Sequence, residues 1–457
     1  MLNPYRVFYE TREEDANAAR ELVAKTRNFL LYHSFLGNDH TIQTYDHMEQ
    51  GLAARANSYQ RQSESFGVDN SFSTDSPGTR SFFNDEIKEK MRELVEPRTP
   101  SASDQDIDSR GGWEELIHCA EIYAEEVLYL QHHSDSPINV SEAIQFMTLK
   151  LSFRCFIDLD IAIKEWHQRV EQFYSDFLFI AREMNRLTNA ATTAPPATPL
   201  NWKDQTALHA ALRTVIGPDT DYDPLAPFIN PMNYLIPAYE HVWTVVLRGV
   251  IEVLTPSENS PKWQESLQSF VGPEEDGERI WDTDDDEEHK IPPADIIKEI
   301  LRLHPPIRHV RRQVTAGDSE VFTDITKCHR SELLAPGDPL EFRPERWRQL
   351  RQAYCHGDTA QDIKTKERQL GFMPFGLTCP SDSLEASDFG MKLIAVLVGV
   401  FCGLLQDTWN LEPLSSLPRP LDSDRNAFQD LMLDDEDDED HFGGAIDQLS
   451  DRMETAL

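Results

Sequence analysis

Two charged positions in the second half of the chain have types and spacings that allow chemistry. The first is Glu240, which follows Pro237 in an almost wholly apolar run, residues 231–254. A proline inside a helix removes a backbone donor and kinks the helix. A buried carboxylate is costly unless it is paired or used. Glu240 is therefore either a functional residue beside a kink or an ordinary carboxylate on the exposed stripe of the helix.

The second position is the pair Glu299 and Arg302, which lies in a short helix predicted over residues 294–303. The helix should stop before Pro305, because residues that precede proline are driven out of the helical region. Two residues separated by three face the same side of a helix and can form an ion pair. Most such pairs are solvated, so the spacing alone does not separate a surface pair from a functional one.

Six cysteines lie far apart, without a C-x-x-C pair and without an early signal peptide. They are Cys119, Cys155, Cys328, Cys355, Cys379 and Cys402. This distribution argues against a disulfide framework and against a cysteine-based zinc site, and it favours a reducing compartment.

Apolar spacing and breaker residues predict a mainly helical chain. The expected helices span residues 16–36, 113–131, 140–158, 159–187, 231–254, 294–303 and 393–405. Composition predicts flexible breaks at residues 59–84, 96–112 and 190–200. Residues 311–316 and 320–326 read as short strands.

The charge balance restricts the partners of the chain. In 457 residues, 43 Lys and Arg stand against 80 Asp and Glu, a net charge of −37. Nucleic acid and anionic membranes are therefore poor partners for the whole molecule. Residues 274–288 hold ten acidic residues against one arginine, and residues 418–457 read as an acidic, disordered tail behind a domain of residues 1–417.

No apolar run reaches the roughly 20 residues that a membrane-spanning helix needs. The uncharged stretch 393–405 fits a buried core helix better, and residues 1–15 are polar. We therefore expect neither a membrane anchor nor a secretory segment in this chain.

Three motifs follow one another in a specific order. Glu299-Ile-Leu-Arg302 precedes Leu-His-Pro-Pro, then Phe342-Arg-Pro-Glu-Arg-Trp347, then the segment from Phe372 to Pro380, which contains Cys379, and finally an apolar helix. This order resembles the C-terminal half of a cytochrome P-450, over about residues 231–413. The resemblance implies a mainly α fold with small β-sheets and a haem between a long distal helix and a cysteine-loop helix. It also implies a buried ion-pair cluster of Glu299, Arg302 and Arg346.

The resemblance further implies haem b as the cofactor, with Cys379 as the axial ligand of the haem iron. A thiolate in that role needs backbone amides and a helix N-terminus near the sulfur, and an apolar helix beside the porphyrin. By the same resemblance, four residues contact the cofactor: Phe372, Phe375, Ala238 and Arg312. Arg312 would bind a haem propionate, with Arg311 or His309 as substitutes.

On the distal helix, members of the family carry a small-Gly-x-acid-Thr stretch. The matching positions here are residues 237–241, in which the acid, Glu240, is kept and the threonine is replaced by His241. The resemblance makes Glu240 and His241 the catalytic candidates for proton delivery. His241 could instead ligate iron or point elsewhere.

Two departures from the family pattern stand out. Only Leu377 and Thr378 separate Gly376 from Cys379, so a second glycine and an arginine of the usual cysteine loop are missing. The region before the distal helix is also shorter than in a typical member.

The resemblance implies a haem-thiolate monooxygenase that inserts one oxygen atom from O2 into a small apolar substrate, a secondary metabolite or a lipid. An NADPH-dependent flavoprotein reductase would dock on basic residues between Arg343 and Arg368, which could equally form a plain solvated surface. An isomerase, dehydratase or peroxygenase that does not activate O2, and a non-catalytic scaffold, are the alternatives. The expected location is intracellular, in the cytoplasm or at the surface of the endoplasmic reticulum.

Overall fold

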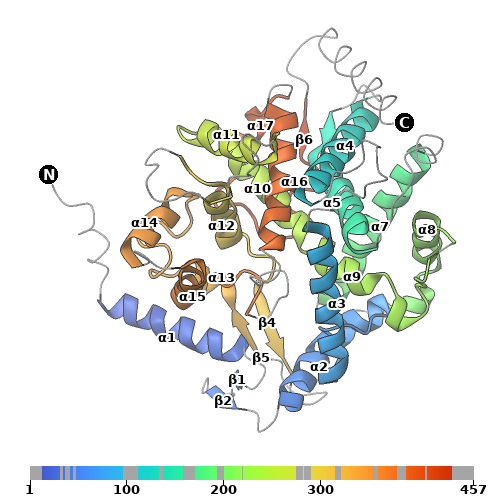
Figure 1. Ribbon diagram of the computed structural model, residues 1–457, viewed down its shortest axis with the longest axis horizontal. Coiled ribbons are helices and arrows are strands. Elements are labelled where there is room, and N and C mark those ends of the chain that lie inside the picture. The colour runs from blue at the N-terminus through green and yellow to red at the C-terminus, as the bar shows by residue number, and fades with distance from the viewer. Residues whose placement is uncertain are drawn as a thin grey trace, which may run out of the picture.

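The computed structural model is a mainly helical protein with small two-stranded sheets (Figure 1). It describes residues 13–30, 34–36, 42–44, 48–95, 112–132, 137–157, 170–192, 200–218, 220–273, 281–282, 290–313, 321–354, 359–377, 388–406 and 409–434. The predicted fold class, mainly α with small β-sheets, is confirmed for these residues.

The helix α16 (Phe389–Gln406) lies near the centre of the molecule (Figure 1). It packs against α4 (Trp113–His132), α10 (Val242–Leu254), α11 (Ser260–Val271) and α12 (Pro293–Leu303). An apolar surface on all sides is what a helix with neighbours all round requires. In the described part of the chain, α16 alone has the length and hydropathy to cross a bilayer, and 72% of it is buried inside the protein.

Six further helices of the first half pack around this core or along its edge. They are α1 (Glu13–Leu30), α2 (Met48–Phe66), α3 (Pro77–Val95), α5 (Val140–Phe156), α7 (Val170–Thr192) and α8 (Thr206–Ile216). The start of α5 is fixed by Asn139, whose side chain accepts a hydrogen bond from the Glu142 backbone N–H. Two short 3-10 turns, Trp202–Asp204 and Pro227–Ile229, connect α7, α8 and the distal helix.

Two sequence predictions in this half are wrong. The helix expected over residues 16–36 ends at Leu30, and β1 (Ser34–Leu36) follows it. The stretch 59–84, expected to be flexible, lies mostly in α2 and α3, because Phe66 and Phe83 are fully buried in the core. Of the other predicted breaks, residues 96–111 and 193–199 lie outside the described residues, as do residues 159–169 of the helix expected over 159–187.

The strands form short antiparallel pairs. β1 pairs with β2 (Ile42–Thr44), and β4 (His309–Arg312) pairs with β5 (Val321–Asp324), with Val310 opposite Thr323. The pair β4–β5 corresponds to the two strands expected near residues 311–326. β4 directly follows the Pro-Pro break after α12, so it places the residues from Pro305 to Arg312 beside the core.

The long distal run consists of three parts. α9 (Met232–Leu235) is followed by a π-helical turn, Ile236–Glu240, and then by α10. Pro237 is the second residue of the π turn, so the α-helical geometry is interrupted at the position where the sequence predicted a kink. Such π turns are often found at functional sites, because they change the direction of side chains within a helix.

Three helices that follow α12 in the chain contact it. They are α13 (Ile325–His329), α14 (Glu345–Tyr354) and α15 (Ala360–Leu370). α13 and α14 pack against α12, and α15 is linked to it by the ion pair of Lys298 and Glu367. α15 begins with a capping box formed by Thr359 and Asp362, and it ends at Gly371 with φ of 111°. That left-handed conformation favours glycine, and it turns the chain into the segment that leads toward Cys379.

The C-terminal boundary differs from the prediction. Residues 418–434 were expected in a disordered tail, but they pack on the body: Leu421, Phe428 and Leu433 are buried, and β6 (Met432–Leu433) pairs with β3 (Ile138–Asn139). The helix α17 (Glu412–Ser415) leads into this segment. The apolar residues among the acids drive this packing. Residues 435–457, which hold most of the acidic block, lie outside the described residues.

Candidate functional site

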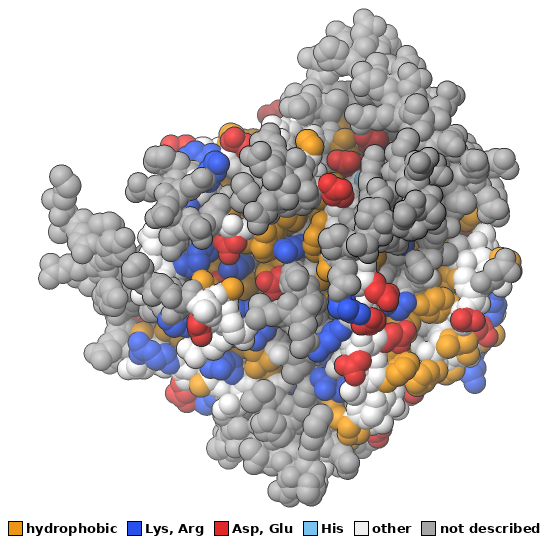
Figure 2. Space-filling model, in the orientation of Figure 1, with side chains coloured by type: hydrophobic (Ala, Val, Ile, Leu, Met, Phe, Trp, Pro, Cys, Tyr) orange, Lys and Arg blue, Asp and Glu red, His pale blue; other side chains and the backbone are white. Residues whose placement is uncertain are grey.

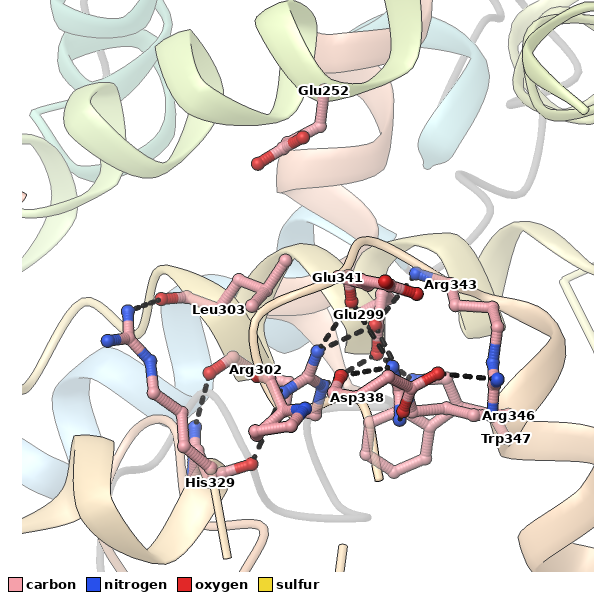
Figure 3. Close-up of polar contacts among 12 residues, drawn as sticks. Glu252, Glu299, Arg302, Leu303, His329, Asp338, Glu341, Arg343, Arg346 and Trp347 are labelled. Atoms are coloured by element: carbon pink, nitrogen blue, oxygen red, sulfur yellow. Dashed lines mark hydrogen bonds and ion pairs between the residues drawn. The ribbon is translucent and has the colours of Figure 1, made fainter. Parts of the chain in front are cut away.

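The carboxylate of Glu299 is the centre of a buried polar cluster (Figure 3). Its Oε1 accepts hydrogen bonds from Arg302 Nη2 at 2.8 Å, from Arg346 Nε at 2.9 Å and from the Arg343 backbone N–H at 2.9 Å. Its Oε2 accepts from Arg302 Nε at 2.9 Å and from Trp347 Nε1 at 3.1 Å. Both oxygens are therefore saturated with donors, so the cost of burying this charge is offset by hydrogen bonds.

Both arginines of the cluster also hold the loop before α14. Arg302 donates to the carbonyl oxygens of Pro339 and Glu341, and Arg346 pairs with Asp338 at 2.8 Å. The resemblance implied one buried cluster of Glu299, Arg302 and Arg346, and the structure brings their side chains together with no more than 1% exposed. The cluster joins α12 to α14 and to the loop of residues 338–341 that precedes α14.

His329 extends this cluster toward the segment that precedes Cys379. Its Nδ1 lies 3.2 Å from the Arg302 carbonyl oxygen, and its Nε2 accepts a hydrogen bond of 2.9 Å from the Met373 backbone N–H. Burial is the main cause that lowers the pKa of His329 to about 3, so the ring is neutral at pH 7. Phe372 stacks on this ring, with 5.4 Å between the centroids.

A cavity of about 730 Å³ lies among the distal run, the β4 segment and the start of α16. The distal run contributes Ala238 and His241, and the segment before Cys379 contributes Phe375. The first turns of α16 contribute Phe389 and Leu393. The volume is in the range of small-molecule and cofactor sites.

Three predicted site residues therefore line the cavity, and other predicted ones do not. Ala238, His241 and Phe375 are in its wall. Phe372, expected as a haem contact, is absent from the described lining and instead packs edge-on against Trp347, with 4.7 Å between the centroids. Cys379, the residue on which the haem expectation depends most, lies outside the described residues.

Arg312, expected to bind a propionate, also lies away from the described cavity wall. Its side chain is 1% exposed, covers the ring of Phe29 and donates to the Arg311 carbonyl oxygen at 2.9 Å. The two substitutes, Arg311 and His309, do line the cavity. The reason is the alternation of β4, in which side chains of neighbouring residues point to opposite faces.

Glu240 is fully buried, but it is not among the described residues of the cavity wall. Its Oε1 lies 2.7 Å from Nη1 of Arg425, and Arg425 also donates to the Glu240 carbonyl oxygen at 2.7 Å. Burial raises the pKa of Glu240 to about 7, against the opposing effect of Arg425. The exposed-stripe alternative for Glu240 is therefore wrong, and its side chain is paired with a cation behind the wall.

His241 lines the cavity as a neutral ring. Burial, with smaller contributions from the charges of Arg425 and Arg308, lowers its pKa to about 3. The sequence-based expectation that His241 donates a proton near neutral pH is therefore wrong for this environment. The hydroxyl of Thr244, which also lines the cavity, donates to the His241 carbonyl oxygen at 3.0 Å.

Sequence reasoning missed Thr244, Arg308 and Arg425. Thr244 lies one helical turn after the position where the family motif has its threonine, so the helical period was the available signal. Arg308 carried no motif signal of its own. Arg425 was missed because it falls in the stretch that composition assigned to the tail.

The described cavity wall is suited to a largely apolar group that carries carboxylates. Most of the wall is apolar, and its charged members are four arginines and one aspartate. The arginines are Arg61, Arg308, Arg311 and Arg425, and the aspartate is Asp424. Haem has this chemistry, so the described residues fit it. In the same described part of the chain, no group of His, Cys, Asp and Glu could hold a metal ion by itself.

The basic residues expected as a reductase docking site are largely engaged with partners. Arg346 and Arg351 are buried, and Arg351 pairs with Asp295 through both guanidinium nitrogens. Lys364 pairs with Asp388, and Arg343 with Asp338. Figure 2 shows basic side chains on the left of the face that it draws, among acidic and uncharged ones rather than as one continuous surface.

No protein-family model matches this chain, and no curated protein matches it. Among solved structures, it is similar to the cytochrome P-450 CYP154C4 from Streptomyces sp. ATCC 11861, solved with testosterone bound. The identity is 14%, the similarity covers 81% of this chain and 79% of that chain, and the TM-score is 0.41. At this identity and TM-score, the similarity extends to neither the substrate nor the reaction.

Proposed function

We propose that the protein is a haem-thiolate oxidoreductase, a monooxygenase of the cytochrome P-450 type that acts on a small organic substrate. The observation that supports this most is the cavity between the π turn of the distal run and the segment that leads to Cys379. When bound, a haem with a thiolate ligand supplies the redox chemistry that activates oxygen. The chain would supply the ligand, the enclosure and the route of protons.

Individual residues would then have separate tasks. Cys379 would hold the iron, Phe375 and Ala238 would contact the porphyrin, and Arg311 would bind a propionate. His329 would be a positioning residue, because its hydrogen bond to the Met373 backbone fixes the segment that runs toward Cys379. The Glu299 cluster in turn holds His329 through Arg302.

The proton route would use the polar groups that face the cavity. The Thr244 hydroxyl is anchored on the His241 carbonyl oxygen, so its position is fixed and it can hold a proton there. The neutral ring of His241 has one nitrogen that accepts and one that donates. Glu240 lies behind the wall, and burial raises its pKa to about 7 against the effect of Arg425, so it would exchange a proton with these groups near neutral pH.

The test is the absorbance spectrum of the reduced protein with carbon monoxide. We expect the purified chain to bind hemin and to give the Soret position of a thiolate ligand. Cys379→Ala should lose that position, whereas Cys119→Ser, at a free thiol on α4, should keep it. The proposal would be overturned if the chain does not bind hemin, or if the spectrum of Cys379→Ala equals that of the wild type. Absence of hemin binding would favour the alternative of a non-catalytic scaffold.

A second function is favoured by one observation. The Glu240 carboxylate is tied to Arg425, and the next residue is a histidine rather than the hydroxyl residue of the family motif. An isomerase, a dehydratase or a peroxide-using enzyme needs no such acid and alcohol in its cavity. Turnover that requires NADPH and a flavoprotein reductase supports the monooxygenase, whereas turnover with peroxide, or with neither addition, supports the second function.

The proposed partners and location follow from the same function. A flavoprotein reductase would have to use the exposed members of the basic set rather than Arg346 or Arg351, which are buried. We propose an intracellular location, in the cytoplasm or at the surface of the endoplasmic reticulum. Fractionation of cells that express the tagged chain would test this location.

A further inference from the structure

Arg308 is a cation of the cavity wall that has no partner among the described residues. It follows Pro305, Pro306 and Ile307, which line the same cavity. Its backbone is fixed, because its carbonyl oxygen accepts a hydrogen bond of 2.8 Å from Ile325 N. Its side chain is partly buried, yet the guanidinium makes neither a hydrogen bond nor an ion pair with any part of the chain that the structure describes.

The cations around Arg308 all have partners of their own. Arg425 binds Glu240 and the Asn185 side chain. Arg248 donates to the carbonyl oxygens of Asp422, Asp424 and Thr244. Arg330 lies 3.4 Å from the Leu303 carbonyl oxygen.

This environment disfavours a charge on Arg308. Burial, and then the charges of Arg425 and Arg330, lower the pKa of Arg308, while Asp424 and Asp422 oppose this. Neither carboxylate forms an ion pair with Arg308: Asp422 Oδ1 accepts from the Asp424 backbone N–H, and Asp424 Oδ1 accepts from the Asn426 backbone N–H. An arginine stays protonated in proteins, so its charge has to be compensated by another group.

The other residues of the cavity wall indicate what kind of ligand would neutralise the charge of Arg308. Near Arg308 in the chain lies Ile307, and the distal run adds Ile236 and Val242 to the wall, with Leu393 from α16. A ligand that fills this volume must be mainly apolar to gain from burial. An anionic group at one end would pair with the arginine, whose planar fork binds a carboxylate through two hydrogen bonds.

We propose that Arg308 binds the carboxylate of the substrate, so that the substrate class is an apolar organic acid rather than a neutral molecule. The assignment of this acid as a substrate rests on the proposed function, but the binding itself does not. A haem propionate is a second source of the same chemistry. The experiment therefore has to separate the two sources.

The test measures binding by titration calorimetry with two probes of equal chain length, dodecanoate and dodecanol. The full-length protein as purified is compared with Arg308→Gln and with Arg182→Gln, which removes an exposed arginine of α7 outside the described cavity wall. We expect the wild type to prefer dodecanoate. Arg308→Gln should weaken dodecanoate binding about 10- to 100-fold and leave dodecanol binding unchanged. Arg182→Gln should change neither affinity by more than about twofold.

Haem content and hemin affinity are measured on the same preparations. If Arg308→Gln weakens hemin binding and leaves dodecanoate binding unchanged, the arginine serves a propionate and the proposal is overturned. Equal affinity of the wild type for the two probes overturns it as well. If the chain binds no hemin but still selects dodecanoate through Arg308, the proposed function fails and this inference stands.

The variants are not expected to lose the fold. Since Arg308 has no side-chain partner among the described residues, Arg308→Gln should keep the unfolding midpoint of the wild type or raise it. Arg308→Lys keeps the charge but not the two-pronged geometry, so it should retain part of the preference for dodecanoate. If Arg308→Gln shows the expected loss of dodecanoate affinity and Arg308→Lys loses as much, the two-pronged geometry of the arginine accounts for the binding. That result also supports the proposal.

Discussion

At the scale of single residues, Glu299 is the position where charge and hydrogen bonding are most concentrated. Its two oxygens accept five hydrogen bonds, four of them from arginine or tryptophan side chains. A glutamine there keeps the shape but removes the charge. Its NH2 group would take the place of one carboxylate oxygen and, being a donor, could not accept the hydrogen bonds made to that oxygen. We expect Glu299→Gln to lower the free energy of unfolding by about 3–5 kcal/mol.

Chemical denaturation of the wild type and the variant measures this difference. Glu258→Gln, at an exposed position after α10, is the control and should change the free energy of unfolding by less than about 0.5 kcal/mol. Equal losses in the two variants would show that the cluster contributes no more than a surface carboxylate.

Glu240 gives a prediction about pH. Burial raises its pKa in the folded state to about 7, above the ordinary value of 4.5. The folded state therefore holds this proton between pH 4.5 and 7 and the unfolded state does not, so this contribution to stability is present below pH 4.5 and is lost as pH rises through 7. Between pH 5 and 8 the loss amounts to about 3 kcal/mol.

The measurement is the free energy of unfolding as a function of pH for the wild type and Glu240→Gln. We expect the wild type to lose about 3 kcal/mol more than the variant between pH 5 and 8. Glu265→Gln, at an exposed residue of α11, should follow the wild type. Parallel curves for the wild type and Glu240→Gln would mean that Glu240 stays ionised across this range.

The surroundings of Glu299 were predicted better than those of Glu240. The spacing of Glu299 and Arg302 predicted only that the two could pair, and the resemblance to cytochromes P-450 implied that Arg346 joins them in a buried cluster. For Glu240, the apolar surroundings predicted burial, but the partner is Arg425, 185 residues away. A pairing over that distance has no signature in one sequence, and local composition pointed the other way.

At the scale of elements, α16 packs closely against α11 at Gly399 but not at Gly403. A Cβ at Gly399 would lie 2.9 Å from Val271 Cγ1 and 3.1 Å from the Leu267 carbonyl oxygen. A Cβ at Gly403 would have its nearest neighbour, Gln268 Cγ, at 3.9 Å. The backbone of α11 therefore requires a glycine at 399 and leaves room for a side chain at 403.

Gly399→Ala should lower the free energy of unfolding by about 1–3 kcal/mol, because the added methyl group forces α11 away from α16. Gly403→Ala should raise it by about 0.5–1 kcal/mol, because alanine is the better helix former and meets no clash. Thermal or chemical unfolding of both variants checks the pair. A stabilised Gly399→Ala would contradict the close contact between the two helices.

The elements that the sequence predicted best are those with a strong apolar pattern. α4, α5, α12 and α16 all occur within a few residues of their expected ranges. The failures have physical reasons of two kinds. α2 and α3 are rich in polar residues, and they are helical because a few side chains such as Phe66 and Phe83 reach the core. The side chain of Arg312 missed the cavity because one step along a strand reverses its direction.

At the scale of the whole molecule, the chain folds back on itself after the central helix. Residues 409–434 return to the core, where Trp409 is buried and β6 pairs with β3. The same segment provides Arg425 to Glu240 and the carbonyl oxygens of Asp422 and Asp424 to Arg248. The body of the protein therefore includes a stretch that composition alone assigns to an acidic tail.

Because residues 409–434 pack on the core, two truncations should differ in stability. A chain that ends after Asp434 removes nine acidic residues and one arginine, and it keeps every contact described above. We expect it to unfold at the denaturant midpoint of the full chain. A chain that ends after Leu417 removes the cation from Glu240 and two of the three carbonyl acceptors from Arg248, and it exposes the apolar surface that Leu421, Phe428 and Leu433 cover. An uncompensated buried charge alone costs about 3–5 kcal/mol.

The shorter chain should therefore lose the cooperative unfolding transition and the near-ultraviolet circular dichroism of a packed core. It should also lose the cavity, since Asp424 and Arg425 are part of the wall. Arg425→Ala in the full chain separates the two effects: it removes the partner of Glu240 but keeps the apolar cover, so it should fold with reduced stability. If the chain that ends after Leu417 unfolds at the same midpoint as the chain that ends after Asp434, residues 418–434 are not part of the body, and the pairing of Glu240 with Arg425 does not stabilise the protein.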